Sequence, residues 1–397
     1  MVARAVKTFA YEDCLFKHHV RMHGWLPLCK QRLKLVKDGP RQRSQRRLRY
    51  FTFCAIGAVD VLMLDVAKVL SRSTTDRFDT VVFFDRSPEA VDETLKRIPG
   101  AVGFNGDFVD LVLLNDTNEQ ASTSATLSPP RDRRNTAKTR NDLRSLAQRR
   151  GFIQQFPFDI INLDLEEFVF KARDPFPGRV INSLRRVFAW ERQELRGPHI
   201  KPHSLTGFTL MFTTRVGPHN LPDSYLGMLR GHLNSNIRSD KELRTLMEMR
   251  SGIREVKVLQ RDNFKLFFEL GLPKVLASVL KEQDWFIDPT EGITIFEFQR
   301  PSSMGPYTML HLAMEVKRQQ PPREQRQPGE LETPEAKKAY KQVGHFIFQR
   351  STTIVDGSTI NRVQLKHDLE LIRARRRKYY PGEVLGPLHC PCGCFDS

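Results

Sequence analysis

Cysteine is scarce in this chain, with six residues among 397, and three of the six fall in the last eight positions. So few cysteines argue against a disulfide framework of the kind that stabilises small secreted domains. Charged residues interrupt every apolar run before it reaches the ~20 residues that span a membrane. The opening residues, MVARAVKTFAYEDC, also lack the apolar segment of a secretory signal. We therefore expect a cytoplasmic protein with no membrane partner.

Acidic residues are also in short supply relative to basic ones. The chain has 63 Lys and Arg against 46 Asp and Glu, a formal net charge of +17. The excess is concentrated in residues 1–49, in residues 131–150 and in the run RARRRK at 373–378. Such blocks favour a polyanionic partner, because each phosphate that they neutralise releases condensed counterions. We expect contact with nucleic acid, DNA or RNA, or with protein partners in a nucleoprotein complex; the alternative is that the blocks are solvated faces or flexible arms.

Strand and helix patterns begin to alternate at Tyr50. Buried strands are predicted at 49–55, 79–85, 101–108, 158–165 and 206–216, with helical spacing of apolar residues between them. Five strands separated by helices predict an α/β fold with a doubly wound, mostly parallel, Rossmann-like sheet. The polar stretch 115–155 is interpreted as an insertion into this domain.

The rest of the chain is less regular. After Gly217 we expect an α+β region with helices at 223–249, 263–281 and 307–318, a hairpin in 284–299 and a strand in 343–355. The Pro, Gln and Glu content of the next stretch predicts a linker. The expected units are a basic N-terminal arm (1–49), the Rossmann-like domain (50–216), an α+β extension (217–318), the linker (319–340) and a C-terminal segment (341–397).

The order of motifs in residues 50–216 resembles the class I S-adenosylmethionine-dependent methyltransferase family. The first strand is followed by AIGAV, with Ala55 and Gly57 at glycine-loop positions, and the second ends at Asp85 in VVFFDRSP. The third strand is followed by Gly106 and Asp107 in FNGDF, and the fourth contains NLDLEE. The resemblance covers roughly two fifths of the chain and implies S-adenosylmethionine as cofactor.

The resemblance also implies a role for each cofactor-side residue. Ligands of open α/β sheets bind at the carboxyl ends of the strands. There, Ala55, Gly57 and Gly106 would let the backbone approach the cofactor, and Asp85 would accept hydrogen bonds from both ribose hydroxyls. Asp107 would accept from the adenine amino group, with Phe108 and Arg86 on the two sides of the adenine ring. The alternative for Asp85 is a charge that interacts favourably with the helix dipole after Ser87.

The fourth strand is the expected acceptor site. Enzymes of this family that methylate amines carry an acid or amide followed by two prolines and an aromatic residue here, whereas this chain has NLDLEEF. The implied catalytic residues are Asn162, Asp164 and Glu166, with the carboxylates acting as general base or as ligands of a divalent ion. The equally weighted alternative is a strand end followed by carboxylates that begin a helix.

Two functions follow from these patterns. The first is a methyltransferase-like protein that acts on or binds nucleic acid, favoured by Asp85 and by the Gly106-Asp107 pair. The second is a catalytically inactive protein of the same fold, serving as a binding or scaffold component of a nucleic-acid-associated complex. The missing prolines, and Ala55 and Val59 at two of the three usual glycine positions, favour the second.

The C-terminal sequence HCPCGCFDS offers a possible zinc site. A structural zinc ion takes four nitrogen or sulfur ligands in a tetrahedron, and His389, Cys390, Cys392 and Cys394 have suitable side chains. Their Cys-x-Cys-x-Cys spacing is tighter than usual, so the N-terminal region would have to contribute ligands. Candidates there are Cys14, His18, His19, His23 and Cys29. The alternative is that the tail cysteines are free thiols.

Overall fold

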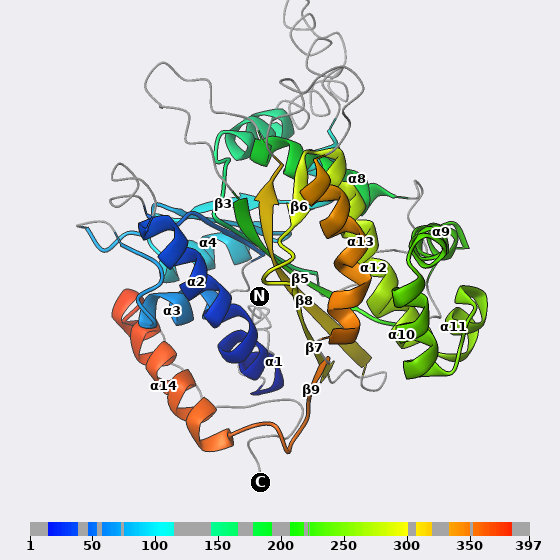
Figure 1. Cartoon of the computed structure of the whole chain (residues 1–397). Helices are drawn as coiled ribbons and strands as arrows, with labels where there is room; N and C mark the ends of the chain where they lie inside the picture. The colour runs from blue at the N-terminus through cyan, green and yellow to red at the C-terminus, as the bar shows by residue number, and fades with distance from the viewer. Residues whose placement is uncertain are drawn as a thin grey trace, which may run out of the picture.

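A single mixed sheet organises the part of the chain that the structure describes (Figure 1). The computed structural model describes residues 15–38, 47–53, 58–72, 75–114, 144–165, 178–192, 207–217, 221, 223–300, 307–319, 333–349 and 352–382. Within these residues the sheet has nine strands, most of them parallel. The predicted α/β class with a mostly parallel sheet is therefore confirmed.

The strands follow the order β3-β2-β1-β4-β5-β8-β7-β9, and the short β6 pairs with β8 beside this path. β1 to β5 are parallel, β8 is antiparallel to both β5 and β7, and β9 is parallel to β7 at the edge. Their bounds are β1 (Tyr50–Thr52), β2 (Val81–Asp85), β3 (Val102–Asn105), β4 (Ile160–Asp164), β5 (Gly207–Arg215), β6 (Trp285–Ile287), β7 (Ile293–Arg300), β8 (Tyr307–Arg318) and β9 (Thr353–Val355).

Helices cover both faces of the sheet and enclose two hydrophobic cores. One face carries α1 (Leu15–Val20), the π-helical turn η1 (Arg21–Trp25), α2 (Leu26–Lys37), α3 (Val59–Val66), α4 (Pro88–Arg97) and α14 (Arg362–Tyr379). The other carries α5 (Phe108–Leu113), helical residues 144–153, α8 (Arg179–Arg192), α9 (Asp223–Ser239), α10 (Lys241–Ser251), α11 (Val256–Asp262), α12 (Phe264–Glu282) and α13 (Pro334–Gln349). None of these described helices has the length and apolar character to cross a membrane.

Local sequence explains the parallel half of the sheet. In β2, Val81 and Phe83 enter one core while Val82 and Phe84 enter the other. Successive side chains of a strand point to opposite faces, so a strand buried on both sides reads as a continuous apolar run. The helix after β2 begins where predicted, because the hydroxyl of Ser87 accepts a hydrogen bond from the Ala90 backbone N–H at 3.2 Å.

Three predictions beyond Gly217 are wrong. Residues 307–318 form strand β8 and not a helix, and 285–299 form no hairpin, because β6 and β7 both pair with β8. Most of 343–355 is helical, since α13 continues to Gln349 and only Thr353–Val355 is extended. The run TMLHLAMEV is apolar on both sides, and its periodicity does not separate a buried strand from a buried helix. Pairing with a distant strand decides between them.

The basic N-terminal region also differs from the expected arm. Residues 15–37 form consecutive helices, and Leu15, Trp25 and Cys29 are buried in the second core. Gly24 allows η1 to approach β7 closely, because a Cβ atom there would meet the ring of Phe296 at 2.9 Å. The N-terminal helices are therefore an integral layer of the fold.

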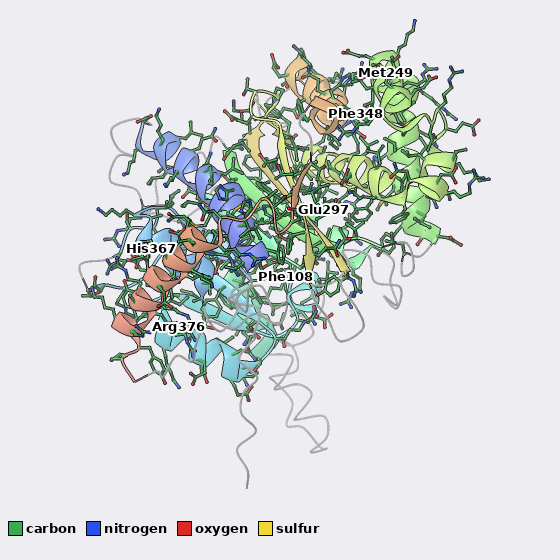
Figure 2. The ribbon with its side chains drawn as sticks, turned by 90° about the horizontal axis from the view of Figure 1, so that it is seen from below. Phe108, Met249, Glu297, Phe348, His367 and Arg376 are labelled. Carbon is green, nitrogen blue, oxygen red and sulfur yellow. The ribbon has the colours of Figure 1, made fainter. Side chains whose placement is uncertain are left out.

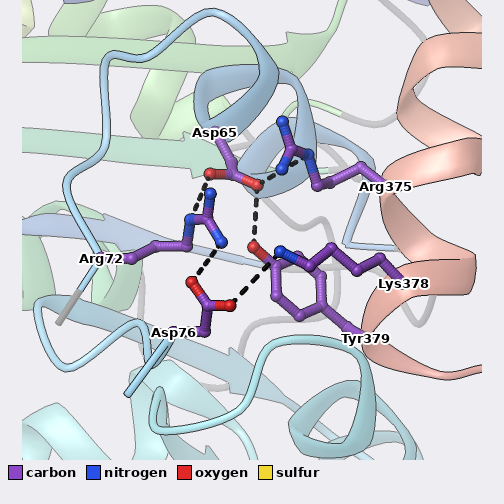
Figure 3. A network of polar contacts seen from close by, with 6 residues as sticks. All are labelled: Asp65, Arg72, Asp76, Arg375, Lys378 and Tyr379. Carbon is purple, nitrogen blue, oxygen red and sulfur yellow. Dashed lines mark hydrogen bonds and ion pairs between the residues drawn. The ribbon is translucent and has the colours of Figure 1, made fainter. Parts of the chain in front are cut away.

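Helix α14 is held to the end of α3 by a polar network (Figure 3). The buried carboxylate of Asp65 lies 2.9 Å from Arg72 Nε and 3.3 Å from Arg375 Nε, and accepts a hydrogen bond of 3.1 Å from the Tyr379 hydroxyl. Lys378 reaches Asp76 at 3.3 Å beside this cluster. The desolvation cost of this buried carboxylate is offset by charge-assisted contacts with two guanidinium groups and by the hydrogen bond from the hydroxyl. Residues far apart in the sequence are thereby joined at one point.

We expect Tyr379→Phe to lower the free energy of unfolding by about 1 kcal/mol, because it removes one hydrogen bond to a buried carboxylate. Asp65→Ala should cost more, about 3 kcal/mol, because Arg375 and Tyr379 lose the carboxylate that they contact and Arg72 keeps only Asp76. Urea denaturation followed by circular dichroism measures both changes. Tyr380→Phe, which removes a neighbouring hydroxyl with no hydrogen bond among the described contacts, is the control. Equal effects of the two tyrosine variants would contradict the role of the network.

Candidate active site

The carboxyl ends of β1, β2, β3 and β4 meet at one edge of the sheet, where open α/β folds bind ligands. Asp85 ends β2 beside Asn105 of β3, and Asp164 ends β4. Because β1 lies between β2 and β4, Asp85 and Asp164 are separated by two strand spacings, about 10 Å. The predicted residues Ala55, Gly57 and Glu166 lie outside the described residues.

The ends of β2 and β3 are joined through Asp85 and Gly106. One carboxylate oxygen of Asp85 accepts a 2.9 Å hydrogen bond from the Ser87 backbone N–H. The backbone carbonyl of Asp85 accepts another, also of 2.9 Å, from the Gly106 N–H. Gly106 has φ +121°, a conformation that glycine adopts readily, and an added Cβ would meet nothing within 4 Å. The structure therefore leaves open space above a glycine that directly adjoins the Asp85 backbone.

Asp107 performs two structural tasks at the same edge. One oxygen caps α5 by accepting hydrogen bonds from Val109 N–H at 2.9 Å and Asp110 N–H at 3.2 Å. The other lies 3.4 Å from Arg86 Nη2, in a pair whose side chains are 35% and 64% exposed respectively. Exposed ion pairs contribute little to stability, so a ligand can compete for Arg86 and for this oxygen at small cost.

Aromatic rings form the wall beside these polar groups. Phe108, which is labelled in Figure 2, packs edge-on against Phe53 with ring centroids 5.0 Å apart, and it also contacts Phe51 and Phe84. Phe53 and Phe108 are only partly buried, and Phe53 directly follows β1. Sequence analysis missed Phe53, although an aromatic residue directly after a predicted first strand is a usable signal. The helix at 144–153 closes the wall through Gln148, whose amide donates to Asn105 at 2.6 Å.

Asn162 lies beneath this edge and is completely buried. Its amide donates a 2.9 Å hydrogen bond to the Tyr50 hydroxyl, which in turn donates to Asp60 at 2.8 Å. Thr52 donates to the same Asp60 oxygen at 2.7 Å. Burial, and then the Asp60 charge, raise the pKa of Tyr50 well above its ordinary value. Asn162 therefore helps to connect β1, β4 and the first turn of α3.

Asp164 forms an ion pair with Lys17 of α1, and both side chains are only 11% exposed. The N-terminal helices thus cover the end of β4, where the family resemblance puts the acceptor site. The Asp164 carboxylate is therefore engaged in an internal ion pair and is not presented to a substrate. Sequence analysis missed Lys17 because no local pattern indicates contact with a residue so far along the chain.

A buried histidine lies next to this pair. His311 Nδ1 accepts a 3.1 Å hydrogen bond from the Trp25 indole N–H and lies 2.9 Å from the Thr213 hydroxyl oxygen. Burial is the main cause that lowers the pKa of His311 to about 3. Burial likewise lowers the pKa of His18 to about 3, with Arg21 adding to the effect. Both imidazoles are therefore neutral in the folded protein at neutral pH.

The end of the predicted cofactor loop is described from Ala58 onward. Ala58 adopts the left-handed conformation with φ +51°, and Val59 is the first residue of α3. The bulky residue at the third glycine position is consequently helical and needs no positive φ. The backbone reversal that glycine would perform here occurs at Ala58 instead.

The possible zinc ligands are only partly within the described residues. His389, Cys390, Cys392, Cys394 and Cys14 lie outside them. Cys29 is a buried core residue, and its burial raises the pKa of the thiol. The rings of His19 and His23 are 4.3 Å apart. Within the described ranges, no three His, Cys, Asp or Glu side chains form a group that could hold a metal ion.

The described cations of the three basic blocks largely support the fold. Arg47 pairs with Asp79 at 2.9 Å, and the Arg49 guanidinium donates to the Gln155 carbonyl at 2.5 Å. Arg149 is buried near the Trp190 ring, while Arg375 and Lys378 belong to the α14 network. The runs of arginine in the sequence therefore do not by themselves indicate which exposed surface could bind a polyanion.

We expect His18 and His311 to contribute a decrease in the free energy of unfolding as the pH falls below about 6.5. The unfolded chain protonates His18 and His311 near 6.5, whereas the folded state resists protonation down to about 3. Stability is thus fully present above the unfolded pKa and is lost toward the folded pKa, by up to about 1 kcal/mol per pH unit for each group. Denaturant titrations at several pH values measure the slope. His311→Asn should reduce it, and the exposed His367→Asn should not.

A double-mutant cycle tests the contact between Lys17 and Asp164. Lys17→Met and Asp164→Asn should each lower the free energy of unfolding, by about 3 kcal/mol for the lysine variant, because a buried charge loses its partner. The double variant should be more stable than the sum of the two losses predicts, with a coupling of about 2 kcal/mol. Additive losses would show that α1 is held to β4 by other contacts.

Comparisons with known proteins leave this geometry as the main guide to function. No protein-family model matches the chain, and no curated protein matches it. The arrangement of the site residues and the motif resemblance in residues 50–216 are therefore the basis for interpreting the protein.

Proposed function

We propose that this chain is an S-adenosylmethionine-dependent methyltransferase-like protein that binds its cofactor at the carboxyl edge of the sheet and acts on or binds nucleic acid. The observation that carries the proposal is the convergence of Asp85, Gly106 and Asp107 on neighbouring strand ends. The strand order β3-β2-β1-β4-β5 is that of nucleotide-binding doubly wound sheets.

The residues at this edge have suitable chemistry for the cofactor. Asp85 can accept hydrogen bonds from two ribose hydroxyls through its carboxylate. The rings of Phe53 and Phe108 offer an apolar wall for adenine, and Asp107 offers an acceptor for the adenine amino group. The open space above Gly106 allows a ligand to approach the backbone. When bound, S-adenosylmethionine would supply an electrophilic methyl group.

A catalytically inactive protein of the same fold is the second candidate. The pairing of Asp164 with Lys17 and the burial of Asn162 favour it, because both proposed acceptor-site residues are already engaged in internal contacts. Such a protein would serve as a binding or scaffold component in a nucleic-acid-associated complex. The replacement of two of the usual glycines by Ala55 and Val59 also favours it.

Isothermal titration calorimetry with S-adenosylmethionine and with its demethylated product tests the cofactor site. Asp85→Ala should weaken binding at least about tenfold, because each hydrogen bond to a charged group contributes about 1.5–3 kcal/mol. Asp92→Ala removes an exposed acid from the middle of α4 and is the matched control. Absence of heat at millimolar ligand, in protein shown to be folded, would reject cofactor binding. Binding without methyl transfer to DNA or RNA would support the second candidate.

A further inference from the structure

Three lysines lie in a row on the exposed side of α2. Lys30, Lys34 and Lys37 are separated by four and three residues, so they lie on one side of the helix, here called the lysine face. The opposite side is buried in the second core through Leu26, Cys29 and Val36. Helix α2 lies on the outside of the sheet (Figure 1). The lysine face is therefore presented to solvent by a helix whose orientation is fixed.

Charge balance distinguishes this helix from the rest of the surface. Residues 15–37 contain no Asp or Glu, and no ion pair of the lysine face occurs among the described residues. The helix dipole favours cations in the last turn of α2, which accounts for Lys34 and Lys37 but not for the lack of acids over the whole region. By contrast, the described arginines of the basic blocks mostly serve internal contacts.

We propose that the lysine face of α2 holds a nucleic-acid strand through its phosphates. The three lysines extend over about 10 Å of helix, the length over which one strand of B-DNA passes about three phosphates. Flexible ammonium groups neutralise phosphates without reading the bases, so the contact is independent of sequence. This inference rests on the nucleic-acid part of the proposed function and assigns it a surface.

The lysine face is also connected to the candidate active site. The same continuous helical segment that carries it also carries Lys17, which pairs with Asp164 at the carboxyl edge. Farther along, Arg32 of α2 lies 3.8 Å from Glu315 of β8, which pairs with the amino-terminal half of β5. The N-terminal helices thus run from the carboxyl edge toward the opposite edge. The lysine face therefore lies on the part of these helices that is away from Asp164.

Fluorescence anisotropy with a labelled single-stranded oligonucleotide and the corresponding duplex tests this surface. Replacing Lys30, Lys34 and Lys37 with Gln should weaken binding at least about tenfold and reduce the slope of log K against log salt by about 2. Replacing Lys337, Lys338 and Lys341 of α13 with Gln is the matched control. It removes the same charge from exposed positions on the opposite face of the sheet.

Three results would overturn the proposal. They are equal losses in the two triple variants, no binding of the unmodified protein to either oligonucleotide at low salt, and binding only to vesicles that contain phosphatidylserine. Calorimetry with S-adenosylmethionine on the α2 variant separates this inference from the cofactor site. Cofactor affinity that is unchanged in the α2 variant, together with no oligonucleotide binding by the unmodified protein, would reject the lysine face and leave the cofactor assignment standing.

Discussion

The requirement that buried polar groups have partners governs how the N-terminal helices pack on the sheet. The face beneath them carries Asp164, Thr213, His311 and Glu315, which an apolar helix could not bury without large desolvation costs. The helices supply matching groups, and Lys17, Trp25 and Arg32 each meet one of these side chains. Such pairing specifies one position of the helices along the strands, because a shift by one residue would leave charges unpaired.

This polar interface bears directly on the proposed transferase activity. A transferase needs its acceptor-site groups available to the substrate, yet the end of β4 is covered by the same contact that holds α1 in place. The proposed cofactor side of the edge has no comparable cover among the described residues: Arg86 and Asp107 are substantially exposed, and the space over Gly106 is open. The acceptor half of the proposed site is therefore covered, whereas the cofactor half is exposed. This difference is the physical reason for keeping both an active and an inactive candidate.

The sequence predictions succeeded where a residue and the group that it contacts lie close together in the sequence. Ser87 caps the helix that follows β2, and this signal lies within a few residues of the backbone group that it satisfies. The strand β8 was misjudged because its apolar residues suit either periodicity, and its identity depends on pairing with β5 across a long separation. Lys17 and His311 gave no local sign of their roles, since their partners come from distant segments. Asp85 was located correctly at a strand end, while the function of that position stays a prediction.

The attachment of α14 limits how far α3 can move. The far end of α3 is fixed through Asp65, by its contacts with Arg375 and Tyr379 of α14. Near the start of the helix, Asp60 accepts hydrogen bonds from Tyr50 and Thr52 of β1. A helix held at both ends cannot turn about either of them, so α3 can move only together with the first strand and the last helix.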